Sequence, residues 1–164
     1  MNITLIGMPG AGKSSVGKAL AERLGMEFID IDKVLEEAHG KPLQQILDEA
    51  GGEGFLKLEE DAVLSYCSVL QNTAISPGGS IVYCKAAMKH LKKISKIVFL
   101  EVPLQEIAAR IAVQGRGIVG GKDKTLEDIY AERLPLYRQY ADYTLVPSGS
   151  VEDNAAQLLA LLDK

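Results

Sequence analysis

Residues 7–14 carry the clearest chemical signal in the chain, because their types and spacing suit the binding of phosphate groups. They read Gly-Met-Pro-Gly-Ala-Gly-Lys-Ser and match the pattern G-x-x-x-x-G-K-[ST]. Glycines let the backbone approach an anion closely, and loop N–H groups at the start of a helix favour negative charge there. Lys13 would place a positive charge at the β- and γ-phosphates, and the Ser14 hydroxyl could bind Mg²⁺. The motif predicts a nucleoside triphosphate site; an ordinary glycine turn would match all eight positions only by coincidence.

Two carboxylates follow this loop at an alternating spacing. Residues 27–32, Glu-Phe-Ile-Asp-Ile-Asp, predict a short strand with Asp30 and Asp32 on the same side. The pair would lie at the carboxyl end of the strand, where α/β sheets build their sites. Asp32 could also serve as the N-cap of the helix expected at 33–39, and the two interpretations are compatible.

Two more segments with adjacent or frequent glycines could face a ligand. A strand at 73–75 runs into Ser-Pro-Gly-Gly-Ser, where Gly78 and Gly79 offer bare backbone N–H groups, although a plain turn would look the same. Residues 114–124 contain four glycines together with Arg116. That composition suits a lid that closes over phosphates, or alternatively a flexible surface loop.

The segments between these motifs predict the elements that must position them. An apolar run from residue 3 leads into the first loop, and the continuous apolar run at 97–102 predicts a strand buried on both faces. Further strands are expected at 27–32, 73–75 and 143–146, and helices at 13–25, 33–39, 42–49, 53–70, 103–113, 125–141 and 151–163. Alternating strands and helices predict an α/β fold with a parallel sheet covered on both faces. Right-handed crossovers would then gather the strand-end loops around one cleft.

Composition restricts the classes of protein that the chain can belong to. Its 164 residues suit a single domain with a sizeable core, and a net charge of −4 gives no reason to expect nucleic acid or membrane binding. No apolar run approaches transmembrane length and Met1 leads directly into the first strand, so we expect a cytoplasmic protein. Cys67 and Cys84 have no metal-binding spacing and are expected to be buried, reduced thiols. His39 and His90 are expected on the solvated surface, like the run of lysines before residue 97.

The remaining question is what receives the phosphate. A GTPase would need a guanine-reading Asn-Lys-x-Asp, which the sequence lacks, and the chain is too short for the accessory elements of most motor ATPases. A small single domain with an acidic pair and a glycine-rich lid suits a kinase that phosphorylates a small hydroxyl compound. Such a reaction needs positioning, charge neutralisation and a base that orients the acceptor.

The chain resembles the shikimate kinases over nearly its whole length. The Asp-x-Asp pair followed by a late Arg-x-Pro-Leu-Tyr is far more specific than the phosphate loop alone. The matches are Gly7–Ser14, Phe28-Ile-Asp30-Ile-Asp32, Gly54-Phe55 with Glu59, Gly78-Gly79, Arg116, Arg133-Leu-Pro-Leu-Tyr137 and Ala141-Asp142. The resemblance implies a three-layer P-loop NTPase fold with a five-stranded parallel sheet in the order 2-3-1-4-5. It also implies one kinase domain over 1–164, with an acceptor-binding region at about 31–62 and a lid at about 112–124.

The resemblance further implies a role for individual residues. ATP would be held by Gly10, Ala11, Gly12, Lys13, Ser14 and Ser15, with Arg110 and Pro147 flanking the adenine. Mg²⁺ would be bound by Ser14 and supported through water by Asp30. Asp32 would bind the acceptor hydroxyl and act as the base, while Gly78, Gly79 and Arg133 would bind the rest of the acceptor. Arg116 would reach the transferring phosphate when the lid closes, so that Lys13, Asp32 and Arg116 form the catalytic set.

Three positions depart from the family pattern. Leu56 stands where the family has an arginine that pairs with the substrate carboxylate, and Lys57 is rotated by about 100° around the helix and should not replace it. Pro77 begins the glycine triplet, and Gly117 follows Arg116 where a proline is usual. We therefore expect an ATP-dependent, monomeric small-molecule kinase, with shikimate the favoured acceptor. The alternatives are a related kinase for another polyol or hydroxy acid, and a non-catalytic ATP-binding paralogue.

Overall fold

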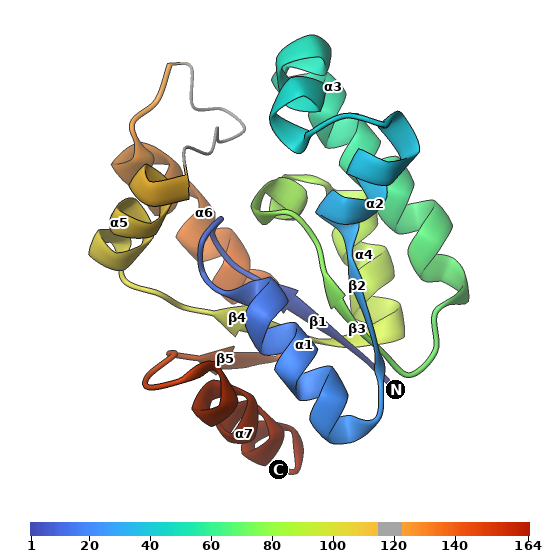
Figure 1. Ribbon diagram of the computed structural model, residues 1–164, viewed down its shortest axis with the longest axis vertical. Coiled ribbons are helices and arrows are strands. Elements are labelled where there is room, and N and C mark those ends of the chain that lie inside the picture. Colours follow the sequence, from blue (N-terminus) through green and yellow to red (C-terminus); the bar gives the residue numbers. More distant parts are fainter. Residues whose placement is uncertain (115–122) are drawn as a thin grey trace.

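The computed structural model describes residues 1–114 and 123–164, which form one parallel sheet flanked by helices (Figure 1). The strands are β1 (Asn2–Ile6), β2 (Glu27–Asp30), β3 (Thr73–Ser76), β4 (Ser95–Leu100) and β5 (Tyr143–Leu145). Their order across the sheet is β2-β3-β1-β4-β5, and every neighbouring pair is parallel. The predicted fold class and strand order are therefore confirmed.

Helices cover both faces of this sheet. α1 packs beside α7 on one face, while α4 and α6 contact β4 from the other, and α3 lies against α2 and α4 (Figure 1). The helices are α1 (Lys13–Leu24), α2 (Ile31–His39), α3 (Leu43–Tyr66), α4 (Lys85–Ile94), α5 (Leu104–Gln114), α6 (Leu126–Tyr140) and α7 (Val151–Leu162), with 3₁₀ turns η1 (Cys67–Val69) and η2 (Gly79–Tyr83).

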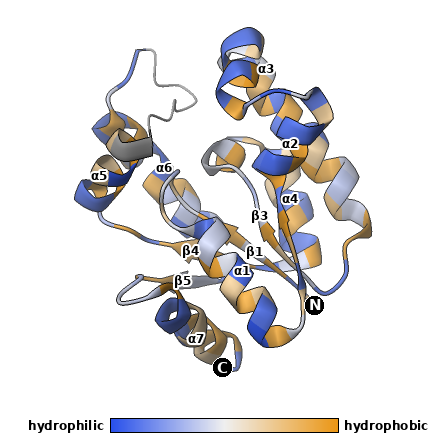
Figure 2. Cartoon of the chain, viewed as in Figure 1, coloured by the Kyte–Doolittle hydropathy of each residue, from blue (hydrophilic) through white to orange (hydrophobic). Residues whose placement is uncertain are grey.

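The core lies between the sheet and the two helical layers. Every residue of β1 and the last four residues of β4 are buried, as expected for parallel strands with both faces covered. Figure 2 shows these strands as hydrophobic, whereas the helices carry hydrophilic residues along part of their surface. Because β1 lies between β3 and β4, the loop that follows β1 leaves the middle of the sheet, where open α/β sheets bind their ligands.

The start of α2 differs from the sequence prediction. β2 ends at Asp30 and the helix begins at Ile31, so Asp32 lies in the first turn of α2 and not on the strand. Asp30 is the N-cap, because its Oδ1 accepts a hydrogen bond from the backbone N–H of Asp32 at 3.0 Å. The prediction that the strand continues to residue 32 was wrong, and so was the alternative with Asp32 as the N-cap. The Asp30 carboxylate satisfies the N–H of Asp32, and the helix begins two residues earlier than predicted.

The long helix α3 consists of two helices joined at Gly51, as the adjacent glycines at 51 and 52 predicted. Gly51 has φ 74° and ψ 174°, which is not helical. The second part ends at Tyr66 and not near residue 70, because residues 67–69 tighten into η1. As a whole, α3 contacts both α2 and α4.

Cys67 and Cys84 are buried and form no disulfide, as expected. His39 is exposed, but His90 is half-buried and its Nε2 is shielded from solvent, so the expectation of a solvated side chain was wrong for His90. The lysines of α4 and the following strand are exposed. Within the described ranges, no helix is long and apolar enough to cross a membrane.

Candidate active site

The loop between β1 and α1 adopts a backbone shape that needs glycine. Gly10 and Gly12 have φ angles of 81° and 92°, in the left-handed region that side chains with a Cβ rarely adopt. Gly12 is the N-cap residue of α1, and no side chain caps this helix end. The backbone N–H groups at the start of α1 can therefore serve an anion, which the helix dipole also favours.

Lys13 is the first residue of α1, and its side chain turns back over the loop. It is only 8% exposed, and its Nζ donates hydrogen bonds to the carbonyl oxygens of Gly7 and Met8, each at 2.9 Å. The ammonium group is thus fixed above the loop whose N–H groups would face phosphate oxygens. This arrangement suits a triphosphate, because a buried cation and an array of backbone donors lie next to each other.

The Ser14 hydroxyl and the Asp30 carboxylate meet beside the loop. Ser14 Oγ donates to Asp30 Oδ2 at 2.7 Å and lies 3.4 Å from Ser76 Oγ. No group of three or more His, Cys, Asp or Glu side chains that could hold a metal ion occurs among the residues that the structure describes. The Ser14 and Asp30 oxygens suit Mg²⁺, which commonly takes one or two protein oxygens and completes its octahedron with water and phosphate oxygens.

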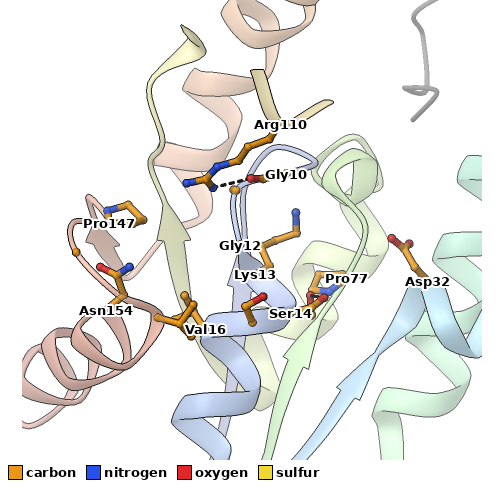
Figure 3. Close-up of a pocket in the computed structure, with 15 residues that line it drawn as sticks. Gly10, Gly12, Lys13, Ser14, Val16, Asp32, Pro77, Arg110, Pro147 and Asn154 are labelled. Atoms are coloured by element: carbon orange, nitrogen blue, oxygen red, sulfur yellow. Dashed lines mark hydrogen bonds between the residues drawn. The ribbon is translucent and has the colours of Figure 1, made fainter. Parts of the chain in front are cut away.

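A cavity of about 610 Å³ opens over this loop. Asp32 stands at one side of it, and Pro147 and Asn154 stand at the other (Figure 3). Arg110 reaches in from α5, and its Nη1 donates to the carbonyl oxygen of Gly10 at 2.7 Å. The cavity brings together most residues that the sequence assigned to the nucleotide or the reaction: Gly10, Ala11, Gly12, Lys13, Ser14, Ser15, Asp32, Arg110 and Pro147.

Asn154 is a lining residue that sequence reasoning missed. Its Oδ1 accepts a hydrogen bond from the backbone N–H of Ser148 at 2.7 Å and so holds the loop that carries Pro147. That loop ends in a capping box in which Ser150 and Asp153 exchange hydrogen bonds at the start of α7. The Ser-x-x-Asp spacing was a readable signal for the helix start, and Asn154 is the next residue.

Gly78 and Gly79 do not line this cavity; both are buried at the packed junction beside it. A Cβ at Gly78 would overlap Glu59 Oε1 and come within 3.1 Å of Asp32 Oδ1. A Cβ at Gly79 would lie 2.7 Å from Pro9 Cδ. The two glycines therefore let β3's loop approach both carboxylates and the phosphate loop at once.

Glu59 is a buried carboxyl at this junction with a raised pKa, and sequence reasoning assigned it no role beyond its place in the resemblance. It is 1% exposed, and its Oε2 accepts a hydrogen bond from Ser80 Oγ. Burial raises the pKa of Glu59 to about 7, and the Asp32 charge acts in the same direction, while Ser80, Arg133 and Lys13 oppose the rise. Its position four residues after the buried Phe55 marked it as an inward-facing residue of α3.

Arg133 is completely buried in α6 and remains a cation. Its Nε donates to Tyr83 Oη at 3.3 Å, and its guanidinium lies over the Tyr83 ring at 5.2 Å from the centroid. Burial alone would lower the pKa of Arg133, but Tyr137 and Tyr83 raise it overall. One turn later, Tyr137 donates from Oη to the carbonyl oxygen of Gly79 at 2.6 Å and stacks on Phe99. The Arg-x-Pro-Leu-Tyr motif thus supplies both the buried cation and a support for the glycine loop.

Comparison with known proteins decides the family. A family model described as shikimate kinase matches residues 9–163. The shikimate kinase of Francisella philomiragia is 36% identical over 156 residues, which cover 93% of this chain and 89% of that protein. This chain belongs to the shikimate kinase family. It is accordingly an ATP-dependent small-molecule kinase.

Solved structures agree with the family assignment. The shikimate kinase from Acinetobacter baumannii in complex with shikimate superposes with a TM-score of 0.90 at 31% identity, over 98% of this chain and 92% of that one. The shikimate kinase from Bacteroides thetaiotaomicron superposes with a TM-score of 0.83 at 27% identity, over 100% of this chain and 99% of that one. The Mycobacterium tuberculosis APS kinase CysC in complex with AMPPNP and APS has a TM-score of 0.57 at 20% identity, over 99% of this chain and 97% of that one. This similarity shows a shared fold alone.

In this member of the shikimate kinase family, Leu56 is half-buried against the core, and the next residue turns outward. Lys57 is 65% exposed and pairs with Asp61 at 3.0 Å and Glu60 at 3.4 Å on the outer side of α3. Lys57 is therefore committed to the surface. Arg116 and most of the expected lid at 112–124 lie outside the described residues.

Proposed function

We propose that the chain transfers the γ-phosphate of ATP to a hydroxyl of shikimate, giving shikimate 3-phosphate and ADP. The observation that carries this proposal is one cavity that holds the phosphate loop with Lys13 and Ser14 on one side and Asp32 on the other. Family membership supports ATP as the donor, and the A. baumannii structure shows a relative of the same fold in complex with shikimate. The reaction belongs to the biosynthesis of aromatic amino acids.

On the nucleotide side, the backbone of residues 10–15 would hold the phosphates together with the Lys13 ammonium. Arg110 and Pro147, which both line the cavity, would flank the adenine. Mg²⁺ would be bound by Ser14 and supported through water by Asp30, whose carboxylate already accepts the Ser14 hydrogen bond. When bound, Mg²⁺ neutralises charge on the β- and γ-phosphate oxygens.

On the acceptor side, Asp32 would accept the proton of the attacking hydroxyl as phosphate transfer begins. Arg133 would pair with the acceptor carboxylate, and Gly78 and Gly79 would bind the acceptor through their backbone. Arg116 would stabilise the transferring phosphate. In this scheme, residues 1–164 form one kinase domain with an acceptor-binding region at about 31–62 and a lid at about 112–124, and the enzyme is a cytoplasmic monomer.

The substitution Asp32→Asn tests the assigned base. The amide keeps the size of the side chain but cannot accept the proton, so turnover should fall by about 10²–10⁴-fold. ATP affinity, measured by titration calorimetry, should stay within about twofold, because Asp32 contributes no positive charge to the phosphates. Asp48→Asn, on the exposed side of α3, should change neither quantity. Retained turnover in Asp32→Asn would remove Asp32 from the mechanism.

The acceptor is tested by measuring ADP release with shikimate, quinate, gluconate and inositols. Leu56 makes this comparison necessary, because a missing charge-assisted hydrogen bond is worth roughly 1.5–3 kcal/mol, or about ten- to a hundredfold in binding. We expect shikimate to give the highest kcat/KM, with a raised KM. A higher kcat/KM for an uncharged polyol would show that the pocket has changed its substrate.

Leu56→Arg restores the arginine of the family pattern and should lower the KM for shikimate about tenfold or more. Leu56 is half-buried, and its carbonyl oxygen accepts a hydrogen bond from Cys84 Sγ at 3.5 Å. Lys57→Arg, one residue later on the exposed side, is the matched control and should leave the KM unchanged. An unchanged KM in Leu56→Arg would mean that Arg133 alone suffices for the carboxylate.

A further inference from the structure

Glu59 has a buried oxygen that the mechanism above does not use. Its Oε2 accepts the Ser80 hydrogen bond, whereas Oε1 has no hydrogen-bond partner among residues 1–114 and 123–164. Oε1 and Asp32 Oδ1 both approach the same face of Gly78, which is free of a side chain. Two carboxyl groups therefore approach each other at Gly78 beside the cavity, and the charge of the buried Arg133 acts on Glu59.

The positive charges of Arg133 and Lys13 only partly offset the effects of burial and of Asp32 on Glu59. The groups that act on Glu59, or that it acts on, are Asp32 of α2, Lys13 of α1, Arg133 and Tyr137 of α6, and Cys84 before α4. Burial raises the pKa of both Tyr137 and Cys84 to about 12, so both stay neutral near pH 7. Lys13 would bind the phosphates of the nucleotide. Arg133 is therefore the cation of this group that would pair with an anionic acceptor.

An anionic acceptor would add a further negative charge to this poorly hydrated region. Asp32 has to remain ionised to act as the base, so Glu59 is the group that can give up its charge. We propose that an anionic acceptor binds together with one proton, which is taken from solvent and held on Oε1 of Glu59. This inference rests on the proposed function, because it assumes an acceptor that carries a carboxylate. With its proton, Oε1 becomes a hydrogen-bond donor on the side that faces Asp32.

The proposal fixes the direction of the pH dependence. The pKa of Glu59 is about 7 before the acceptor binds, and a nearby anion raises it further. Well below pH 7 Glu59 is already protonated, so acceptor binding takes up little further proton. Between pH 7 and about 9, binding takes up a proton, and affinity falls as the pH rises. An acceptor carboxyl with an ordinary pKa near 4 stays ionised throughout and contributes nothing to this change.

Titration calorimetry of the full chain with shikimate, in buffers of different ionisation enthalpy, counts the protons directly. We expect uptake approaching one proton at pH 8 and much less at pH 6, and a KM for shikimate that rises about tenfold between pH 7 and pH 9. Glu59→Gln should abolish the uptake and flatten the KM profile, whereas Glu60→Gln, next to it on α3, should change neither. Binding of shikimate at pH 8 without proton uptake, or the same profile in Glu59→Gln, would overturn the proposal.

Ser80→Ala provides a second variant that keeps Glu59 in place. The Ser80 hydrogen bond lowers the pKa of Glu59, so its loss should raise that pKa and shift proton uptake to higher pH. An unshifted profile would contradict the role of Glu59. If shikimate fails but another acceptor of the panel turns over, the proposed substrate is wrong, and the proton count is made with that acceptor. An anionic acceptor should then still take up a proton and an uncharged polyol should not; if only uncharged acceptors bind, the inference is overturned.

Discussion

The nucleotide side and the acceptor side of the cleft are built in different ways. Six consecutive residues, 10–15, form the floor of the nucleotide side, and much of what they offer is backbone N–H at the start of α1. The proposed acceptor side would draw on Asp32 from α2, Glu59 from α3, Gly78 from the loop after β3 and Arg133 from α6. The first side is thus set by local sequence, and the second by how four distant segments pack. Changes on the first should abolish the reaction, while changes on the second, apart from the assigned base Asp32, should mainly alter acceptor binding.

Lys13→Met gives the largest expected effect and tests the nucleotide side. It removes the buried ammonium that would neutralise the β- and γ-phosphates, so kcat/KM for ATP should fall about a thousandfold. Lys18→Met, on the exposed side of the same helix, should leave the kinetics unchanged. Steady-state kinetics measures both, and circular dichroism checks that the helix content is kept. A loss confined to the acceptor KM would contradict the division between the two sides.

Arg133→Met tests the acceptor side. Losing the buried cation should raise the KM for shikimate about a hundredfold, while the KM for ATP stays within about twofold. The control is Arg138→Met, on the exposed side of α6, where the ion pair with Glu101 is accessible to solvent and worth less than about 1 kcal/mol. Equal rises in the two KM values would mean that Arg133 supports the whole cleft and not the acceptor alone.

Gly78→Ala sharpens the comparison with a smaller change. The added methyl group would displace Glu59 Oε1, which should raise the acceptor KM about tenfold and lower the free energy of unfolding by about 1–3 kcal/mol. Gly52→Ala is the matched control, because a Cβ there meets nothing within 4 Å. Urea unfolding and acceptor kinetics give the two values. An unfolding free energy like that of the wild type would show that the junction is less tightly packed than the contacts imply.

Sequence periodicity predicted the layered fold well because parallel strands and their helices carry strong local patterns. The continuous apolar run that became β4 and the glycines that break α3 are examples. The error at the start of α2 arose where a side chain competes with the backbone pattern: Asp30 captures the N–H of Asp32 and starts the helix two residues early. Whether the strand continues or the helix begins depends here on a single side-chain hydrogen bond, and the apolar–polar alternation of the sequence carries no information about that bond.

The site could be predicted to the extent that it is contiguous. The phosphate loop was readable in full, and the structure places it in the cavity together with Asp32, Arg110 and Pro147. The approach of Glu59 to Asp32 depends on the packing of α3 beside the loop after β3, which no local pattern specifies. The burial of His90 Nε2 was also missed.

Asp30 connects the two sides of the cleft. Its Oδ2 accepts from the Ser14 hydroxyl at the start of α1, and its Oδ1 accepts from the backbone of Asp32 at the start of α2. One carboxylate therefore links the start of α1, which would bind the ATP phosphates, to the start of α2, which would bind the acceptor substrate. A single side chain can in this way keep two substrates in register.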